Sequence, residues 1–169
     1  MSGVPAIFLD RDGVVVQERG EHTWRLEDFH ILPTVPEALK AIRGAGMLCV
    51  LITNQSGIGL GLYGHADVDR LHDYLHAHLA RQGAAIDAVY YCPHHPTQGR
   101  CLCRKPGSLL LERAIARYGI DPSASVMIGD RDRDVEAAAA VGARGILVEA
   151  NAPLMEVLKT HALIPWQER

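Results

Sequence analysis

Short apolar runs alternate along the chain with stretches in which apolar residues recur every three or four positions. Each run has the length and composition of a buried strand, and the runs cover residues 6–9, 47–53, 88–92, 125–128 and 145–148. Between them, apolar residues at helical spacing predict four helices. Their marker residues are Val35, Ala38, Leu39 and Ile42; Val68, Leu71, Leu75 and Leu79; Leu111, Ala114, Ile115 and Tyr118; and the alanine-rich stretch 135–141. A further short helix is expected between Pro153 and Pro165.

This alternation predicts a parallel sheet covered by helices on both faces, a three-layer α/β fold of the Rossmann-like kind. In such a sheet, ligands bind beyond the carboxyl ends of the strands, where adjacent loops converge. The segments that follow the predicted strands carry nearly all of the reactive groups, at residues 10–13, 53–57, 92–95 and 129–132. We therefore expect one edge of the sheet to hold the functional site.

The composition is that of one globular domain, with 169 residues, 48% of them hydrophobic, and a net charge of -3. Lysine and arginine are spread along the chain, which argues against nucleic acid as a partner. No apolar stretch approaches the length of a membrane span, and residues 1–5 do not resemble a secretory signal. We therefore expect a cytoplasmic protein without membrane contact, in which residues 1–169 form a single domain.

Three aspartates directly follow predicted strands, Asp10 and Asp12 after the first and Asp130 after the fourth. Carboxylates that converge there would repel one another, and a magnesium ion, which prefers oxygen ligands, would relieve the repulsion. Asp10 is ionised at neutral pH and can attack phosphorus without a base. Asp12 can then protonate the leaving oxygen and later accept a proton from water. The alternative is that these aspartates only cap helices and begin turns.

The loop after the second predicted strand offers hydroxyl, amide and backbone donors that suit phosphate oxygens, from Thr53, Asn54 and Ser56. Taken alone, an ordinary polar turn explains these residues equally well. Lys105 supplies a movable positive charge of the kind that stabilises a transferring phosphoryl group. Its assignment depends on the acidic and polar residues that are expected beside it.

A cysteine and histidine segment forms a C-x-H pattern followed by a C-x-C pattern, with Cys92, His94, Cys101 and Cys103. Three thiolates and one imidazole match a closed tetrahedral zinc site, and the metal would order a loop that is too polar to pack by itself. The alternatives are a disulfide between two of these cysteines, or His95 as the ligand in place of His94.

Two further patterns are given no functional role. His72 and His76 lie one turn apart in the second predicted helix, and we interpret them as part of a solvated helix face rather than as metal ligands. Residues 59–64 fit the dinucleotide pattern G-x-G-x-x-G, but polar residues separate them from the preceding strand. A nicotinamide cofactor is therefore not expected.

The chain resembles the haloacid dehalogenase superfamily over most of its length. The four motifs of that superfamily are matched in order by Asp10-Arg11-Asp12-Gly13, Thr53-Asn54-Gln55-Ser56-Gly57, Arg104-Lys105-Pro106 and Gly129-Asp130-Arg131. The cysteine segment is similar to that of the zinc-bearing branch, which contains phosphatases of heptose bisphosphates and of histidinol phosphate.

The resemblance implies a haloacid dehalogenase fold without a cap domain, with a zinc-stapled loop at residues 92–103. It implies Asp10 as the nucleophile, Asp12 as the acid and base, and Thr53 and Lys105 as stabilisers of the phosphoryl group. Magnesium is then held by Asp10, Asp130 and the backbone carbonyl of Asp12. The implied substrate contacts are Asn54, Gln55, Ser56, Arg104 and Arg131.

The implied activity is magnesium-dependent hydrolysis of a phosphomonoester through an aspartyl-phosphate. The expected partner is a small phosphorylated sugar, and the favoured reaction is removal of the 7-phosphate from a heptose 1,7-bisphosphate by a monomeric enzyme that serves surface-glycan synthesis. The alternatives are histidinol phosphate as substrate, or a zinc-stapled binding protein of the same fold without turnover.

Overall fold

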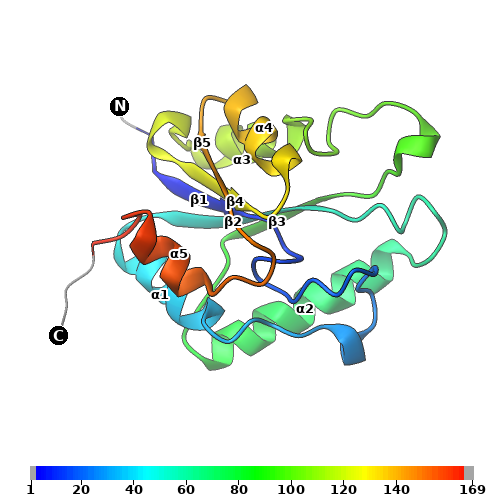
Figure 1. Cartoon of the computed structure of the whole chain (residues 1–169), viewed down its shortest axis with the longest axis horizontal. Helices are drawn as coiled ribbons and strands as arrows, with labels where there is room; N and C mark the ends of the chain where they lie inside the picture. Colours follow the sequence, from blue (N-terminus) through cyan, green and yellow to red (C-terminus); the bar gives the residue numbers. More distant parts are fainter. Residues whose placement is uncertain (1–2, 166–169) are drawn as a thin grey trace.

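The computed structural model describes residues 3–165, and a five-stranded sheet forms the centre of this part of the chain (Figure 1). The strands are β1 (Ala6–Leu9), β2 (Leu48–Asn54), β3 (Ala88–Cys92), β4 (Val126–Gly129) and β5 (Arg144–Leu147). Their order across the sheet is β3-β2-β1-β4-β5, and every pair of neighbours is parallel. β1 is central and fully buried, which explains why its sequence is continuously apolar.

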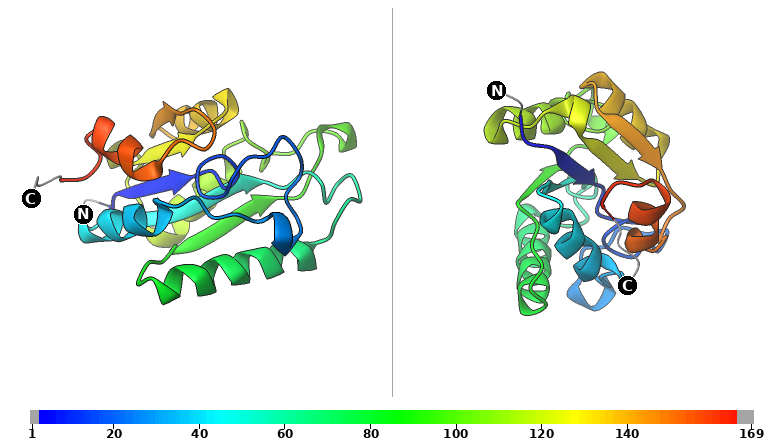
Figure 2. Two further views of the ribbon diagram at one scale, coloured as in Figure 1. Left: turned by 60° about the horizontal axis from the view of Figure 1, so that its bottom comes forward. Right: turned by 90° about the vertical axis from the view of Figure 1, so that its left-hand side faces the viewer.

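Helices cover both faces of the sheet (Figures 1 and 2). One face carries α1 (Val35–Gly44), α2 (His65–Arg81) and α5 (Leu154–Thr160), and the other carries α3 (Leu109–Tyr118) and α4 (Asp132–Ala140). Because strand residues alternate between faces, Ile7 and Leu9 pack in the first core, whereas Ala6 and Phe8 pack in the second. Short 3-10 turns occur at Leu26–Asp28, Pro96–Gln98 and Pro122–Ala124.

The predicted three-layer α/β fold is confirmed, and every predicted strand and helix is present within residues 3–165. β1 and β3 have the predicted bounds, and the other elements shift by a few residues at their ends. α2 begins at His65, earlier than its apolar stripe indicates, because the Asp67 carboxylate accepts a hydrogen bond of 2.9 Å from the Gly64 backbone and caps the first turn. The 3-10 turns have no periodic signal and were not predicted.

Loops from the carboxyl ends of β1, β2 and β4 meet at one edge of the sheet, as expected for a parallel α/β fold. The segment between β1 and α1 folds back over this edge, where Val16 forms isolated bridges with Asp12 and Ile31. The connections from β1 to β2 and from β2 to β3 contain one α-helix each. No helix in the described part of the chain is long and apolar enough to cross a membrane.

Candidate active site

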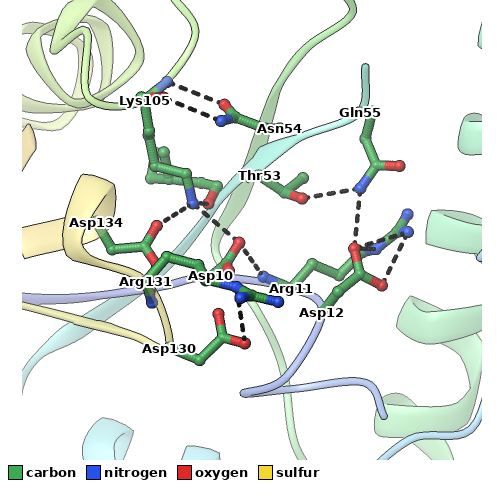
Figure 3. Close-up of polar contacts among 11 residues, drawn as sticks. Asp10, Arg11, Asp12, Thr53, Asn54, Gln55, Lys105, Asp130, Arg131 and Asp134 are labelled. Carbon is green, nitrogen blue, oxygen red and sulfur yellow. Dashed lines mark hydrogen bonds and ion pairs between the residues drawn. The ribbon is translucent and has the colours of Figure 1, made fainter. Parts of the chain in front are cut away.

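Lys105 lies at the centre of the predicted site, and its ammonium group bridges two carboxylates. Nζ is 2.9 Å from Asp10 Oδ1 and 2.6 Å from Asp134 Oδ1, and it donates to the Ile52 carbonyl at 2.7 Å (Figure 3). All three charged side chains are buried. Burial disfavours the charge on Lys105, but Asp10 and Asp134 outweigh this effect and raise its pKa above the ordinary value. Lys105 is therefore a fixed positive charge beside the Asp10 carboxylate.

Asp10, Asp130 and Asp134 form a compact acidic cluster in which one carboxylate oxygen from each residue lies within 4.8 Å of the other two. Burial, and then the neighbouring Asp10, raises the pKa of Asp130 to about 7, and burial also raises the pKa of Asp134. Asp130 Oδ2 is buried and accepts no hydrogen bond from any of residues 3–165. Crowded carboxylates with a buried oxygen that accepts no hydrogen bond are the oxygen-only donors that magnesium prefers, so the cluster fits this ion.

Gly13 allows Asp130 to approach the loop that follows β1. The backbone of Gly13 has a φ of +91°, a conformation that favours glycine, and a Cβ at this position would collide with the Asp130 carboxylate. The Gly13 N–H donates to the Val16 carbonyl at 2.7 Å and closes the turn. The tight turn at Gly13 therefore lets the Asp130 carboxylate lie against the loop after β1.

The Asp12 side chain points toward Arg11 and Gln55 rather than toward Lys105 (Figure 3). Arg11 donates to both Asp12 oxygens at 3.1 Å, and Gln55 Nε2 donates to Oδ2 at 3.2 Å. Burial raises the pKa of Asp12, while the Arg11 guanidinium opposes this rise. Arg11 is itself fully buried, with a further hydrogen bond of 2.9 Å to the Thr23 carbonyl. Arg11, for which the sequence suggested no role, therefore fixes the orientation of Asp12.

The loop after β2 makes contacts within the site. Asn54 exchanges two hydrogen bonds with the Lys105 backbone, with Nδ2 donating to the carbonyl at 3.2 Å and Oδ1 accepting from the N–H at 3.0 Å. Gln55 Nε2 donates to Thr53 Oγ1 at 2.9 Å as well as to Asp12. The Asn54 and Gln55 side chains were expected to contact substrate, and in the structure their hydrogen bonds go to other residues of the site. Both residues nevertheless line the cleft described next.

A cleft of about 300 Å³ opens over Asp10 and Asp130. The other three predicted substrate contacts, Ser56, Arg104 and Arg131, line it as well. Arg131 lies at the rim with its Nε 3.7 Å from Asp130 Oδ2, and its side chain is 54% exposed, so it remains available to a ligand. The cleft also has walls that the sequence did not indicate, formed by Glu18, Gly20, Glu21, His22, Thr23 and Arg133. Its three arginines can bind an anionic group, and its carboxylates can hold a cation or accept hydrogen bonds from a polar ligand.

Cys92, His94, Cys101 and Cys103 converge, as predicted for the zinc loop. The Sγ atoms of the three cysteines are 3.1 to 3.8 Å apart, and His94 Nδ1 lies 3.3 Å from Cys103 Sγ and 3.4 Å from Cys92 Sγ. A tetrahedron with Zn–S bonds of about 2.3 Å has edges of about 3.8 Å, so the four atoms are close to a zinc geometry.

The two alternatives for this segment find no support in the geometry. All four cysteines of the chain are free, so no disulfide competes for Cys92, Cys101 or Cys103. His95 Nδ1 is exposed and pairs with Thr97 Oγ1 at 2.8 Å, away from the thiols. The soft donor set of three thiols and one imidazole therefore fits zinc with His94 as the nitrogen ligand.

The interpretation of His72 as part of a solvated helix face is wrong. Its side chain is 6% exposed and packs edge-on against the Tyr91 ring, with the ring centroids 6.0 Å apart. Burial, with added repulsion from Arg11 and His76, lowers the pKa of His72 to about 3. His76 is exposed, as expected. The apolar stripe of α2 did not reveal the difference because His72 lies next to Leu71 on the edge of that stripe.

Asp134 is the site residue that the sequence interpretation missed. It is fully buried on α4, in line with the buried Ala137 and Ala138. The signal in the sequence was its spacing, because residues 134, 137 and 138 lie on one face of a helix. A carboxylate on the buried face of a helix needs a polar partner. That partner is Lys105.

Comparisons with known proteins agree with this geometry. The family model described as HAD-hydrolase-like matches residues 102–160. A D-glycero-beta-D-manno-heptose-1,7-bisphosphate 7-phosphatase of Photorhabdus laumondii is 38% identical over 160 residues, which cover 90% of this chain and 84% of that protein. The protein of the same name from Escherichia coli K12 is 38% identical, with 89% of this chain and 82% of that protein covered.

A solved structure shows the same likeness in three dimensions. The D,D-heptose 1,7-bisphosphate phosphatase from B. bronchiseptica, complexed with magnesium and phosphate, is 34% identical and superposes with a TM-score of 0.82. The match covers 96% of this chain and 89% of that chain.

Proposed function

The chain belongs to the D-glycero-β-D-manno-heptose-1,7-bisphosphate 7-phosphatase family of haloacid dehalogenase-like hydrolases, and on this premise we propose that it removes the 7-phosphate of that sugar. The observation that carries the proposal is the Asp10 carboxylate, which lies against the Lys105 ammonium at 2.9 Å within the acidic cluster at the floor of the cleft. Phosphoryl transfer requires this combination of an ionised oxygen nucleophile and fixed positive charge.

In the proposed first step, a carboxylate oxygen of Asp10 attacks phosphorus, a P–O bond to Asp10 forms and the bond to the sugar oxygen breaks. The departing sugar oxygen takes its proton from Asp12. In the second step, water attacks phosphorus and gives a proton to Asp12, the P–O bond to Asp10 breaks, and inorganic phosphate leaves with Asp10 restored as a carboxylate. Each aspartate returns to its starting state.

Positive charge and hydrogen-bond donors act on the oxygens of the transferring phosphoryl group. Lys105 and the Thr53 hydroxyl have this role, and the Asn54 side chain holds the Lys105 backbone in place. Magnesium would be held by Asp10, Asp130 and the backbone carbonyl of Asp12, with Asp134 behind Lys105, and it supplies charge neutralisation to the phosphate when bound. Ser56, Arg104 and Arg131 contact the rest of the substrate from the cleft wall.

The zinc loop at residues 92–103 has a structural role in this proposal. The backbone N–H of Arg104 donates to Cys101 Sγ at 3.3 Å. This hydrogen bond joins the cysteine and histidine group directly to the segment that carries Arg104 and Lys105. Cys92, His94, Cys101 and Cys103 would hold zinc, and the bound ion would fix the loop that carries Arg104 to the cleft. The chain acts as a monomeric, cytoplasmic enzyme of one domain, without a separate cap.

A comparison of two substrates tests the proposal. The purified protein with magnesium is expected to release one phosphate per heptose 1,7-bisphosphate, and to hydrolyse histidinol phosphate with a much lower kcat/KM. Faster phosphate release from histidinol phosphate would show that this compound is the preferred substrate, and the proposed chemical steps would still hold. A protein that binds both compounds and hydrolyses neither would instead be a zinc-stapled binding protein.

A further inference from the structure

Gln55 and Tyr63 form a hydrogen-bonded pair behind Asp12. The Tyr63 hydroxyl donates to Gln55 Oε1 at 2.9 Å, and Gln55 Nε2 donates to Asp12 Oδ2 at 3.2 Å. The exposed fractions of the Gln55 and Tyr63 side chains are only 2% and 7%. This pair connects Asp12 to residues outside the motifs that were singled out in the sequence.

The orientation of the Gln55 amide follows from its partners. Asp12 Oδ2 also accepts from Arg11 Nε, so it is an acceptor and the NH₂ end of Gln55 must face it, while the carbonyl end faces the Tyr63 hydroxyl. Burial raises the pKa of the Tyr63 hydroxyl, and this effect outweighs the Gly57 backbone, which lowers it. The tyrosine is therefore a neutral donor whose proton is directed to Gln55 Oε1.

Packing fixes the Tyr63 ring as well as its hydroxyl. The ring lies so close to the Gly57 backbone that a Cβ at Gly57 would collide with it. On another side it stacks on Trp24, with centroids 6.1 Å apart and an angle of 13° between the planes, and His22 meets it edge-on at 6.1 Å. His22 also lines the cleft. These contacts hold Tyr63 in one position, and its hydroxyl in turn holds the Gln55 carbonyl oxygen.

We propose that Gln55 is a positioning residue for the acid Asp12, and that Tyr63 acts through Gln55 by holding its amide with the NH₂ group toward Asp12. This inference rests on the proposed phosphatase function, because it assigns Asp12 a proton transfer to the leaving oxygen. Arg11 holds Asp12 from the other side with two hydrogen bonds, so the carboxyl group lies between two fixed donors. Gln55 Nε2 also donates to Thr53 Oγ1 at 2.9 Å, so without the Tyr63 hydroxyl only the NH₂ end of the amide is held and the side chain can shift away from Asp12.

Leaving-group dependence is the readout that distinguishes this role from a structural one. A sugar phosphate loses a strongly basic alkoxide and needs the proton of Asp12, whereas p-nitrophenyl phosphate loses a phenolate that departs without it. The ratio kcat/KM includes only the steps up to the aspartyl-phosphate, so the later role of Asp12 as a base does not enter. A defect in acid positioning therefore lowers kcat/KM for the sugar phosphate and spares the aryl phosphate.

The experiment measures kcat/KM on heptose 1,7-bisphosphate and p-nitrophenyl phosphate for the wild type and for Asp12→Asn, Tyr63→Phe, Gln55→Leu and the Tyr63→Phe/Gln55→Leu double variant. Asp12→Asn is expected to lose roughly 10²–10⁴-fold on the sugar and far less on the aryl phosphate. Tyr63→Phe, which removes one oxygen atom, is expected to lose about tenfold on the sugar and less than about twofold on the aryl phosphate. In the double variant, Tyr63→Phe should add nothing to the effect of Gln55→Leu, since the two residues act in series.

Tyr74→Phe is the matched control, because Tyr74 is a partly exposed tyrosine of α2 that contacts Phe29 and His78 rather than the site. Tyr74→Phe should leave kcat/KM unchanged on both the sugar phosphate and the aryl phosphate. Equal losses of Tyr63→Phe on the two substrates, or independent losses that multiply in the double variant, would overturn the inference while the behaviour of Asp12→Asn still supports the proposed function. A wild type that hydrolyses neither compound would overturn both.

Discussion

Asn54 and Lys105 are joined by two hydrogen bonds in opposite directions, from Asn54 Nδ2 to the Lys105 carbonyl at 3.2 Å and from the Lys105 N–H to Asn54 Oδ1 at 3.0 Å. Both bonds go to the Lys105 backbone, so they set where the side chain starts. The ammonium at its far end is held by Asp10 and Asp134. The lysine that serves the phosphoryl group is therefore fixed at both ends.

Asn54→Ala should lower activity by displacing Lys105. Each lost hydrogen bond to the Lys105 backbone is worth about 1 kcal/mol, so we expect a fall in kcat/KM of about tenfold or more and a modest fall in melting temperature. Steady-state kinetics and thermal unfolding check this. Ser123→Ala, at an exposed turn remote from the cleft, is the control and should retain full activity. An Asn54→Ala enzyme with wild-type kinetics would show that this clamp has no bearing on catalysis.

Buried His72 should make the stability of the protein depend on pH. Its pKa is about 3 in the folded chain and 6.5 in the reference state, and Arg11, His76 and Tyr91 surround it. Below pH 6.5 the unfolded chain binds a proton that the folded chain does not, so the stability associated with neutral His72 is present above this pH and is lost as the pH falls toward 3.

His72→Gln should remove this pH dependence. Between about pH 7.5 and about pH 5, the variant is expected to lose roughly 2 kcal/mol less unfolding free energy than the wild type. Urea unfolding at the two pH values measures the difference, and His76→Gln on the exposed face of α2 serves as the control. Identical pH responses of the wild type and His72→Gln would mean that His72 is not buried in its neutral form.

Magnesium should stabilise the protein more at high pH than at low pH. The pKa of Asp130 is about 7, so below this value a proton competes with the ion for the carboxylate. We expect the rise in melting temperature on adding magnesium to be clearly larger at about pH 8 than at about pH 6, because metal binding requires deprotonated ligands. Asp130→Asn should show little rise at either pH. An equal rise at both pH values in the wild type would place the ion elsewhere.

Zinc removal should lower both stability and activity. Protein purified without added metal is expected to contain about one zinc per chain, as measured by elemental analysis. Chelation or Cys101→Ser should lower the melting temperature and reduce turnover through Arg104, whose backbone N–H contacts Cys101 Sγ. Cys49→Ala, which alters a buried cysteine outside the cluster, should keep its zinc. Reduced, active protein without zinc would exclude the metal staple.

The sequence predicted the parts of the site that depend on strand ends. Asp10, Asp130 and Lys105 converge because the carboxyl ends of parallel strands and their loops share one edge, and that edge follows from the alternation of apolar runs and helical stripes. The cysteine segment was equally predictable, because its spacing of cysteine and histidine is specific to zinc sites.

The contacts of Arg11, Gln55 and Tyr63 were not predictable in this way. Arginine is usually found on the surface, yet the Arg11 guanidinium is buried over the Phe29 ring. This contact forms because the fold brings residue 29 back to the loop after β1. Gln55 and Tyr63 lie in one glycine-rich loop, and which of its side chains face inward depends on how that loop packs. Hydrophobic periodicity and secondary-structure propensity carry no information on such hydrogen bonds, because only the tertiary arrangement determines them.

The most direct test of the account is phosphate release from heptose 1,7-bisphosphate by the wild type and by Asp10→Asn, with and without magnesium. Asn has the same shape as Asp but is not an anionic nucleophile, so the variant should lose at least about 10³-fold in kcat while remaining folded. The wild type should release one phosphate per sugar, and only with magnesium present. An Asp10→Asn enzyme that retains turnover within about tenfold of the wild type would contradict the assignment of Asp10 as the nucleophile.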